Sequence, residues 1–468
     1  MNRDRREQRE LDRRDFLKLG AAASVGAALA STQAFAAGRR PSSLDGPARE
    51  FVAPPIEKVR IGYVGVGGMG TAHVRNLVRI PGCEIRAVCD IVPERVERAQ
   101  KIVTDAGFPK PEGYTRGPYD FRRLCERDDL DLVYTATPWE WHVPVCVAAM
   151  EAGKHAATEV PAAVTLDEAW QLVETSERTQ RYCIMMENCT YDREEMMIFN
   201  MVRQGLLGEI LHGAAGYLHD LRHVKFNFAA RGEAIWRLAH SIKRNGNLYP
   251  THGLGPIAQV MDINRGDQFD YLVSMSTKAM GLSLYAAEVF GPDSKWAKTK
   301  YALGDVNVTL IRTKKGRTIT LYHDTNLPRP YSRIHLVQGT KGIARKWPDP
   351  RRTSGVMGFV YIEGRSPTHR WETLESYRAE YEHPLWKDLE EMSKGAGHGG
   401  MDYIEDYRLI KCLREGVPLD MDVYDAAAWS AISELTEISV ANRSRPVDIP
   451  DFTRGAWKNR PPLGILRA

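Results

Sequence analysis

The feature that most constrains this 468-residue chain is a glycine-rich turn between an apolar stretch and a helical pattern. The turn reads Gly65-Val66-Gly67-Gly68-Met69-Gly70. In such a turn the first glycine allows a tight bend, the second lets the backbone approach a pyrophosphate, and the third lets helix and strand pack closely. Asp90 follows a second apolar stretch, where a carboxylate can accept hydrogen bonds from ribose hydroxyls and repel a 2′-phosphate. The pattern predicts a site for NAD rather than NADP.

Short apolar runs alternate with amphipathic segments from residue 58 to residue 188. We expect strands over 60–65, 84–89, 132–135, 155–158 and 182–186, and helices over 72–80, 94–106, 142–152 and 166–179. Because parallel strands need crossover helices, this alternation indicates a doubly wound parallel sheet. The fold class is therefore α/β, with a Rossmann dinucleotide-binding domain over residues 58–188.

The pattern changes after residue 189. Asp192 can cap a helix that continues through Val202. Strands are expected over 271–276, 306–312, 318–323 and 334–338, and further helices over 403–414 and 424–442. The hairpin order of these strands predicts a mostly antiparallel sheet with one open face, in a second α+β domain over residues 189–468 for substrate binding and oligomerisation.

The N-terminus has the features of an export signal. Arg13-Arg14 precedes the apolar run 19–30, and the small residues of Ala34-Phe35-Ala36 follow. This order resembles a twin-arginine signal over residues 1–36, although a basic tail without a signal function is the alternative. The apolar run is too short to remain as a stable membrane span. We therefore expect the twin-arginine machinery to export the chain, with a Pro-rich linker over residues 37–57.

Charge and cysteine content exclude several classes of protein. Lys and Arg number 64 against 60 Asp and Glu, a net charge of +4, which is too near balance for a nucleic-acid coat. The seven cysteines form no CxxC pair, and no histidine cluster has zinc-ligand spacing. We expect core thiols, no disulfide framework and no metal site.

Polar and aromatic residues follow three of the expected strands. These blocks are Thr137-Pro138-Trp139-Glu140-Trp141-His142, Thr158-Glu159-Val160-Pro161 and Glu187-Asn188. Open parallel sheets bind ligands at the carboxyl ends of their strands, so each block is expected near a nicotinamide or its ribose. The alternative for the two tryptophans is plain core packing.

These blocks resemble the Gfo/Idh/MocA family of sugar-handling, dinucleotide-dependent proteins. Together with later blocks the resemblance is closest to glycoside hydrolase family 109, whose described activity is α-N-acetylgalactosaminidase, and it covers roughly residues 58 to 465. The later blocks are Gly216-Tyr217, His219-Asp220-Leu221-Arg222, Tyr249-Pro250-Thr251-His252-Gly253-Leu254-Gly255-Pro256 and His398-Gly399-Gly400-Met401-Asp402.

The resemblance and the glycine turn together imply a set of contacts. Contacts to NAD are expected at Gly65, Gly67, Gly68, Met69, Gly70, Asp90, Trp139, Glu140, Trp141, His142, Glu159, Val160, Asn188 and Tyr249. Contacts to the sugar are expected at Tyr217, Arg237, Tyr249, Pro250, Thr251, His252 and Tyr331. The sequence assigns no role to four further polar residues, His219, Asp220, His223 and His398.

His252, Tyr249 and Tyr217 are the expected catalytic residues. A helix beginning near Pro256 would disfavour a charged imidazole just before it, so a neutral His252 could act as a base. The alternative is a capping or buried structural histidine. Tyr217 and Tyr331 could equally be core aromatics, and Arg237 could equally belong to a surface ion pair.

One departure from the family pattern bears on the reaction. Family dehydrogenases have a lysine where this chain has Val160, so lysine-assisted sugar oxidation is disfavoured. The resemblance implies hydrolysis of an α-N-acetylgalactosaminide by oxidation, elimination, water addition and reduction, one of the NAD-dependent exceptions to two-carboxylate hydrolysis. A sugar oxidoreductase of the same fold and a non-catalytic sugar-binding protein are the alternatives. The open sheet also suggests a homo-oligomer.

Overall fold

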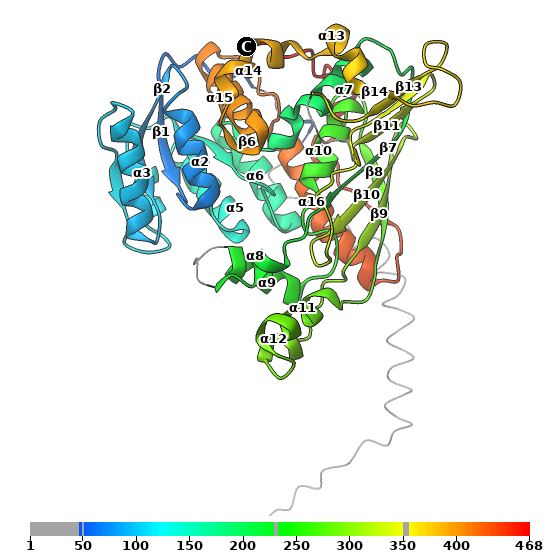
Figure 1. Ribbon diagram of the computed structural model, residues 1–468. Coiled ribbons are helices and arrows are strands. Elements are labelled where there is room, and N and C mark those ends of the chain that lie inside the picture. The colour runs from blue at the N-terminus through cyan, green and yellow to red at the C-terminus, as the bar shows by residue number, and fades with distance from the viewer. Residues whose placement is uncertain (1–45, 49–50, 229–232, 350–354) are drawn as a thin grey trace, which may run out of the picture.

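The computed structural model describes residues 46–48, 51–228, 233–349 and 355–468. The expected export signal over residues 1–36 lies outside the described residues, as does much of the expected linker. Figure 1 shows two sheets, with the N-terminal sheet on the blue side of the molecule and a larger sheet, green to yellow, on the other.

The first sheet has six strands in the order β3-β2-β1-β4-β5-β6, and every pairing is parallel. The strands are β1 (Val59–Val64), β2 (Cys83–Cys89), β3 (Glu112–Tyr114), β4 (Leu132–Thr135), β5 (His155–Thr158) and β6 (Cys183–Met185). The prediction of a parallel doubly wound sheet is confirmed. Strand β3 has no apolar run of its own and was not predicted.

Crossover helices join these strands. They are α2 (Gly68–Leu77), α3 (Pro93–Asp105), α4 (Phe121–Cys125), α5 (His142–Glu151) and α6 (Leu166–Thr179), with the 3₁₀ turn η1 (Trp139–Trp141) before α5. Helix α6 begins where predicted because Thr165 and Glu168 form a reciprocal capping box.

The second sheet has nine strands in the order β14-β13-β12-β11-β7-β10-β9-β8-β15. Its strands are β7 (Ile210–Leu218), β8 (Phe269–Ser276), β9 (Asn307–Thr313), β10 (Thr318–Asp324), β11 (Leu336–Gly339), β12 (Gly342–Arg345), β13 (Phe359–Ile362), β14 (Glu372–Thr373) and β15 (Val447–Asp448). Only the β7–β10 pair is parallel among the described strands of this sheet, so the predicted mostly antiparallel sheet is confirmed.

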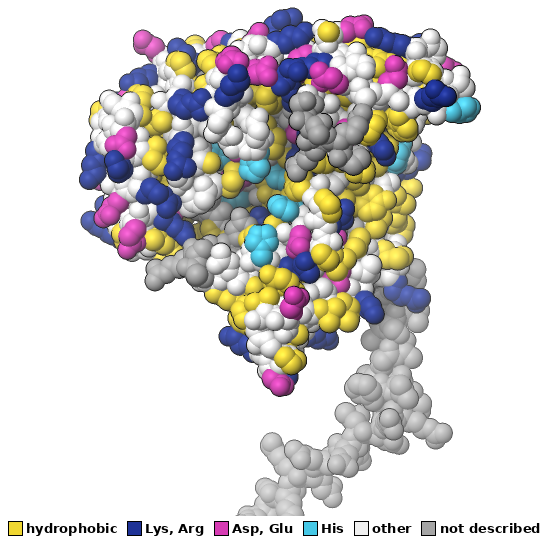
Figure 2. All heavy atoms as spheres, in the orientation of Figure 1, with side chains coloured by type: hydrophobic (Ala, Val, Ile, Leu, Met, Phe, Trp, Pro, Cys, Tyr) yellow, Lys and Arg dark blue, Asp and Glu magenta, His cyan; other side chains and the backbone are white. Residues whose placement is uncertain are grey.

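Helices cover one face of this sheet and the other face is open. Helix α10 (Thr251–Val260) packs on β7, and α16 (Val423–Ala441) packs on β8. On the open face, Leu211, Met275 and Leu310 are at least half exposed. Figure 2 shows hydrophobic side chains gathered on the flank that the sheet forms.

The remaining helical elements surround these layers. They are η2 (Asn188–Tyr191), α7 (Arg193–Arg203), α8 (Arg222–Lys225), α9 (Glu233–Lys243), α11 (Gly281–Phe290), α12 (Lys295–Lys298), η4 (Leu374–Tyr377), α13 (Arg378–Tyr381), α14 (Pro384–Ser393), η5 (Gly397–Gly400), α15 (Met401–Glu415) and η6 (Ala456–Lys458). Asp192 caps α7 as predicted, since its side chain accepts from Glu194 N and Glu195 N.

The C-terminal half also supplies helices to the first sheet. Helix α15 packs on α2, the helix after the glycine turn, and α16 packs on α6 and β6 (Figure 1). Residues far apart in the sequence therefore meet beside the glycine turn.

One predicted boundary is wrong in a way that affects the site. Helix α10 begins at Thr251, so Pro256 lies inside it and His252 lies in its first turn. Tertiary packing outweighs the proline here: a Cβ on Gly253 would lie 2.5 Å from Gly216 N, so the first turn is pressed against β7. A proline in the second turn of a helix removes one hydrogen bond, which this packing offsets.

All seven cysteines are buried and free. They lie in the cores of both halves, as predicted for core thiols. Burial raises the pKa of Cys83, Cys89 and Cys125 to about 12, so these thiols are protonated and unreactive.

Candidate functional site

The glycine turn has the geometry expected for its sequence. Gly65 has φ +85°, and a Cβ there would lie 2.8 Å from the backbone of Ala136. A Cβ on Gly70 would lie 1.9 Å from Gly65 O, so this glycine allows the close packing of helix and strand. Gly68 has nothing within 4 Å of a Cβ position, and Gly67 has only an Arg95 nitrogen, at 3.6 Å. The outer side of the turn is therefore open to a ligand.

The space outside the turn is polar and basic. A cavity of about 410 Å³ is lined by Gly67, Gly68, Thr71, Arg75, Arg95 and Arg98. Helix α2 begins at this cavity with no side-chain cap on its first amides. Uncapped amides and arginines are what a pyrophosphate requires, so the residues present fit a dinucleotide. The three arginines were not predicted, because arginine on a helix surface is ordinary in a sequence.

The side chain of Asp90 is hydrogen-bonded to the backbone of the glycine turn. Its carboxylate accepts hydrogen bonds from Val66 N at 3.0 Å and Val92 N at 2.9 Å, and Arg95 lies 3.8 Å away. A carboxylate accepts about four hydrogen bonds, so acceptor capacity remains for ribose hydroxyls.

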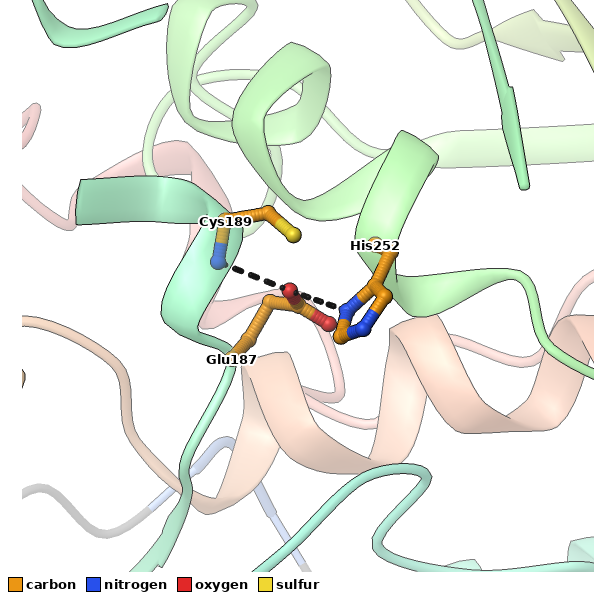
Figure 3. A group of neighbouring side chains, drawn as sticks. All are labelled: Glu187, Cys189 and His252. Carbon is orange, nitrogen blue, oxygen red and sulfur yellow. Dashed lines mark hydrogen bonds and ion pairs between the residues drawn. The ribbon is translucent and has the colours of Figure 1, made fainter. Parts of the chain in front are cut away.

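Beyond β6, the edge strand of the same sheet, a histidine and a carboxylate form a close pair (Figure 3). His252 Nδ1 lies 2.7 Å from Glu187 Oε1, and this oxygen also accepts from Cys189 N at 3.1 Å. Glu187 is fully buried, yet its interactions with His252 hold the pKa of Glu187 below the usual range against the effect of burial. An ionised Glu187 holds the proton of His252 on Nδ1 and leaves Nε2 as an acceptor.

Glu187, Cys189 and His252 could also be considered as metal ligands, since their donor atoms lie within 4.8 Å of one another. Two features favour the hydrogen-bonded pair instead. Glu187 Oε1 already accepts two hydrogen bonds, and burial raises the pKa of the Cys189 thiol well above its ordinary value. A protonated thiol is a poor metal ligand.

Two tyrosines, Tyr217 and Tyr249, pack on His252, and a third, Tyr331, packs on Tyr217. The Tyr217 and Tyr249 ring centroids are 4.7 Å apart, and Tyr331 lies 6.1 Å from Tyr217. His252 lies 4.8 Å from Tyr249 and 5.4 Å from Tyr217. The structure thus brings together the three predicted catalytic residues and Tyr331. Arg237 lies 5.0 Å above the rings of both Tyr249 and Trp139 and so belongs to the same group.

The aromatic block after β4 divides between the site and the core. Trp139 is buried and stacks on Tyr249 at 5.5 Å, whereas the Trp141 ring packs edge-on against Tyr119. Both ring nitrogens of His142 face carbonyl oxygens, Pro161 O at 2.7 Å and Thr137 O at 2.8 Å. His142 therefore holds the backbone of this loop, and the structure does not bring its ring to the tyrosines.

The block after β6 contacts α15, and the block after β5 contacts α2. Asn188 Nδ2 donates to Asp402 Oδ1 at 2.7 Å, and Glu159 Oε1 lies 2.8 Å from His73 Nε2. Val160 is buried and Thr251 lies buried at the start of α10. Pro250, also an expected sugar contact, is the residue immediately before this helix.

A second histidine–carboxylate pair lies beside Asn188 and was not predicted as catalytic. His398 Nδ1 is 2.8 Å from Asp402 Oδ2 and 3.4 Å from Asn188 Nδ2. The hydrogen bond to Asp402 raises the pKa of His398 above its ordinary value. His398 has φ +48° and is followed by Gly399 and Gly400 with positive φ, so the loop holds the ring in an unusual backbone conformation. The run of glycines around one histidine was the available signal.

Figure 2 shows the molecule hollowed between its two halves, with histidine side chains along the hollow. Fold and site together define a dinucleotide-binding protein whose C-terminal half brings tyrosines and His252 to Glu187 at the edge of the parallel sheet. Residues 59–187 match the NAD-binding Rossmann fold of an oxidoreductase family, and residues 191–459 match the C-terminal domain of glycosyl hydrolase 109. The chain belongs to glycosyl hydrolase family 109. The predicted NAD cofactor and the predicted glycosidase class are confirmed.

Relatives are similar over nearly the whole chain. A glycosyl hydrolase family 109 protein of Shewanella pealeana is 47% identical over 98% of this chain and 99% of its own. A Shewanella oneidensis protein named alpha-N-acetylgalactosaminidase is 46% identical, with the same coverage of each chain. Among solved structures, levoglucosan dehydrogenase with NADH and levoglucosan has a TM-score of 0.65 at 20% identity, covering 84% of this chain and all of its own. An inositol dehydrogenase homolog from Azotobacter vinelandii has a TM-score of 0.61 at 21% identity, over 85% of this chain and 98% of its own.

The export prediction is also confirmed. Residues 10–30 match the twin-arginine translocation signal, so the chain is exported across the cytoplasmic membrane. Within the described part of the chain, every helix is too short or too polar to cross a bilayer.

Proposed function

We propose that this protein hydrolyses α-N-acetylgalactosaminides. The similarity to the Shewanella oneidensis protein of that name supports the substrate class. The observation that carries the proposal is the meeting of His252, Glu187 and the three tyrosines beyond β6, at the edge of the dinucleotide-binding sheet. NAD held by the glycine turn would supply a hydride acceptor and donor there, so that the oxidation could be reversed within each turnover.

His252 is the proposed base for the sugar hydroxyl that is oxidised. Glu187 fixes the ring and stabilises the imidazolium that forms when Nε2 takes the proton. His252 retains 13% side-chain exposure, so a substrate can reach it. Val160 stands where family dehydrogenases have a lysine. The His252–Glu187 pair would accept the hydroxyl proton in its place, so the chain can oxidise a hydroxyl without an ammonium group at that position.

Oxidation to a 3-ketone acidifies the C2 hydrogen, and a second base must then remove it. Burial raises the pKa of Tyr249 well above its ordinary value, so a Tyr249 phenolate is costly. Tyr217 is better placed, since its hydroxyl lies 3.0 Å from His219 Nδ1, which can share the proton. We therefore assign proton removal to Tyr217 and a packing and binding role to Tyr249.

The leaving glycosidic oxygen needs a proton donor. His398 suits this role because Asp402 favours its charged form and about half of its side chain is exposed. Removal of one proton by Tyr217 and donation of another by His398 completes the elimination, and the same groups can serve water addition in reverse.

The test uses the protein as isolated, with no added NAD, and a chromogenic α-N-acetylgalactosaminide in D₂O. We expect hydrolysis with deuterium at C2 of the released sugar and no net NADH. Product without C2 label would contradict elimination chemistry, and steady formation of NADH with a keto sugar would instead indicate a sugar oxidoreductase. Binding of the glycoside without turnover would indicate a sugar-binding protein.

We also propose that residues 58–188 and 189–468 are the two domains, and that the second mediates self-association. Two separate sheets support the division. On the open face of the larger sheet Met275 is 64% exposed and Leu310 50%, which is unfavourable for a face left in water. Light scattering should give a mass above one chain, and the pair Met275→Asp and Leu310→Asp should reduce it to one chain. A monomeric unmodified protein would contradict this proposal.

A further inference from the structure

A fully buried histidine lies between the glycine turn and the sugar-facing end. His73, on α2, has Nδ1 2.9 Å from both carboxylate oxygens of Asp406 on α15 and Nε2 2.8 Å from Glu159 Oε1. Only a ring protonated on both nitrogens can donate to both carboxylates. Burial alone would lower the pKa of His73, but Asp406 and Glu159 together raise it well above its ordinary value. His73 is therefore an imidazolium.

The groups around His73 are mainly acids and hydrogen-bond partners of those acids. Asn76 Nδ2 donates to Asp406 Oδ2 at 3.0 Å, and the Tyr134 hydroxyl lies 3.1 Å from His73 Nδ1. Glu405 is 1% exposed, and burial raises its pKa well above its ordinary value, which favours its neutral form. The imidazolium thus compensates the charges of Asp406 and Glu159, which would otherwise be costly to bury.

Glu159 connects this buried group to the site. Its side chain is 15% exposed, whereas those of His73 and Asp406 are 1% and 0% exposed. Its second oxygen, Oε2, accepts from Val160 N at 3.2 Å, so both oxygens are held. It lies near enough to His398 and Tyr249, two residues of the proposed site, for its charge to raise the pKa of both.

We propose that His73 is a positioning residue: by donating to Glu159 it fixes this carboxylate at the nicotinamide end, where a negative charge favours the positively charged, oxidised form of the dinucleotide. The inference rests on the proposed placement of Glu159 beside the nicotinamide, and it holds whichever glycoside is hydrolysed. It also explains why one helix contributes to both ends of the cofactor. The first turn of α2 faces the phosphate cavity, and its next turn holds Glu159.

Two substitutions separate the contacts of His73. An asparagine amide can reach the position of Nδ1, so His73→Asn keeps a partner for Asp406 and loses the one for Glu159. A glutamine amide can reach the position of Nε2, so His73→Gln keeps the donor to Glu159. On the holoenzyme, labelled NAD⁺ and NADH are titrated separately to displace the resident dinucleotide, which gives their relative affinities without any sugar.

His73→Asn takes away the donor that holds Glu159, so we expect this carboxylate to leave its fixed position. NAD⁺ should then bind about tenfold more weakly relative to NADH, the size of one lost charge interaction in a partly buried site, although loss of the imidazolium's own charge acts in the opposite direction. His73→Gln should change this ratio much less. Glu159→Gln should match His73→Asn, and the double variant His73→Asn/Glu159→Gln should show no further change, because both act through one carboxylate.

The matched control is His383→Gln, another fully buried imidazole, which caps α14 by accepting from Leu385 N at 3.2 Å. It should lower thermal stability and leave the NAD⁺ to NADH ratio unchanged. Equal weakening of NAD⁺ and NADH by His73→Asn, or additive effects with Glu159→Gln, would overturn the positioning role. If Glu159→Gln leaves the ratio unchanged, the placement of Glu159 is wrong. Loss of glycoside hydrolysis alone bears only on the proposed function.

Discussion

The two ends of the proposed site, the glycine turn and the group around His252, are built in opposite ways. The glycine turn is open, polar and lined by arginines, and its first helical amides carry no side-chain cap. The group around His252 consists of tyrosines and two histidine–carboxylate pairs, which come from the segment after β6, from α10, and from η5 and the first turn of α15. Local backbone makes the first end, whereas contacts between distant segments make the second.

This difference assigns cofactor binding to the glycine turn and proton transfer to the group around His252. Phosphates need backbone amides and positive charge, which one turn and one helix provide. Proton transfer at a sugar needs groups with different proton affinities, and burial beside a chosen partner sets these affinities. Changes at the two ends should therefore affect different measurements.

The largest effect is expected at the sugar-facing end. His252→Ala should lower the hydrolysis rate about a thousandfold, the usual contribution of a positioned acid–base group. Glu187→Gln should lower it less, because the ring remains without its anionic partner. The bound dinucleotide, measured by absorbance after denaturation, should remain.

The control for this pair is His212→Gln, on the outer part of β7, where the ring contacts Thr318 Oγ1 at 3.0 Å. Its hydrolysis rate should match that of the unmodified protein. Near-normal turnover by His252→Ala would reduce His252 to a structural residue and remove the distinction between the two ends.

The next effect is expected at the glycine turn, where two alanines should behave differently. Gly67→Ala leaves the fold intact, since its Cβ would meet only Arg95, at 3.6 Å. The methyl group projects toward the ligand and should weaken NAD binding about tenfold or more. Gly70→Ala would place a Cβ 1.9 Å from Gly65 O and should destabilise the protein itself, by about 3 kcal/mol or more.

Thermal unfolding and dinucleotide content distinguish the two alanine variants. In the NAD-free state, Gly67→Ala should unfold at the same temperature as the unmodified protein. Gly70→Ala should unfold at a lower temperature. Full dinucleotide content in Gly67→Ala would show that the open side of the turn does not face the phosphates.

The sequence predicts features that depend on local signals and misses those that depend on contacts between distant segments. Strands β4 and β5 and helix α6 have the predicted bounds, because short apolar runs and a capping box are local signals. The start of α10 was not predictable, since the close contact of Gly253 with Gly216 overrides the local effect of Pro256. Tertiary contacts of this kind leave no local trace.

The residue types of the site were predictable but their pairing was not. Glu187 and His252 are separated by 65 positions, and His73 and Asp406 by 333. A histidine in a sequence is compatible with a base, an imidazolium or a packed ring. Burial and the nearest carboxylate decide among these states, and both come only from the folded chain.

The smallest expected effect concerns the charge of His398. Asp402 raises the pKa of His398, so its protonated form persists to higher pH than in an isolated histidine. A reaction step that needs a proton from His398 is fast at low pH, and its rate falls as the pH rises through the raised pKa of His398. Asp402→Asn removes the anion, so the fall should move to lower pH while the rate at the acid end drops by less than about tenfold. The check is a pH profile of kcat/KM on a substrate with a poor leaving group. With a leaving group that departs without a proton, the same variant should show little change, and an unshifted profile on the poor substrate would exclude His398 as the donor.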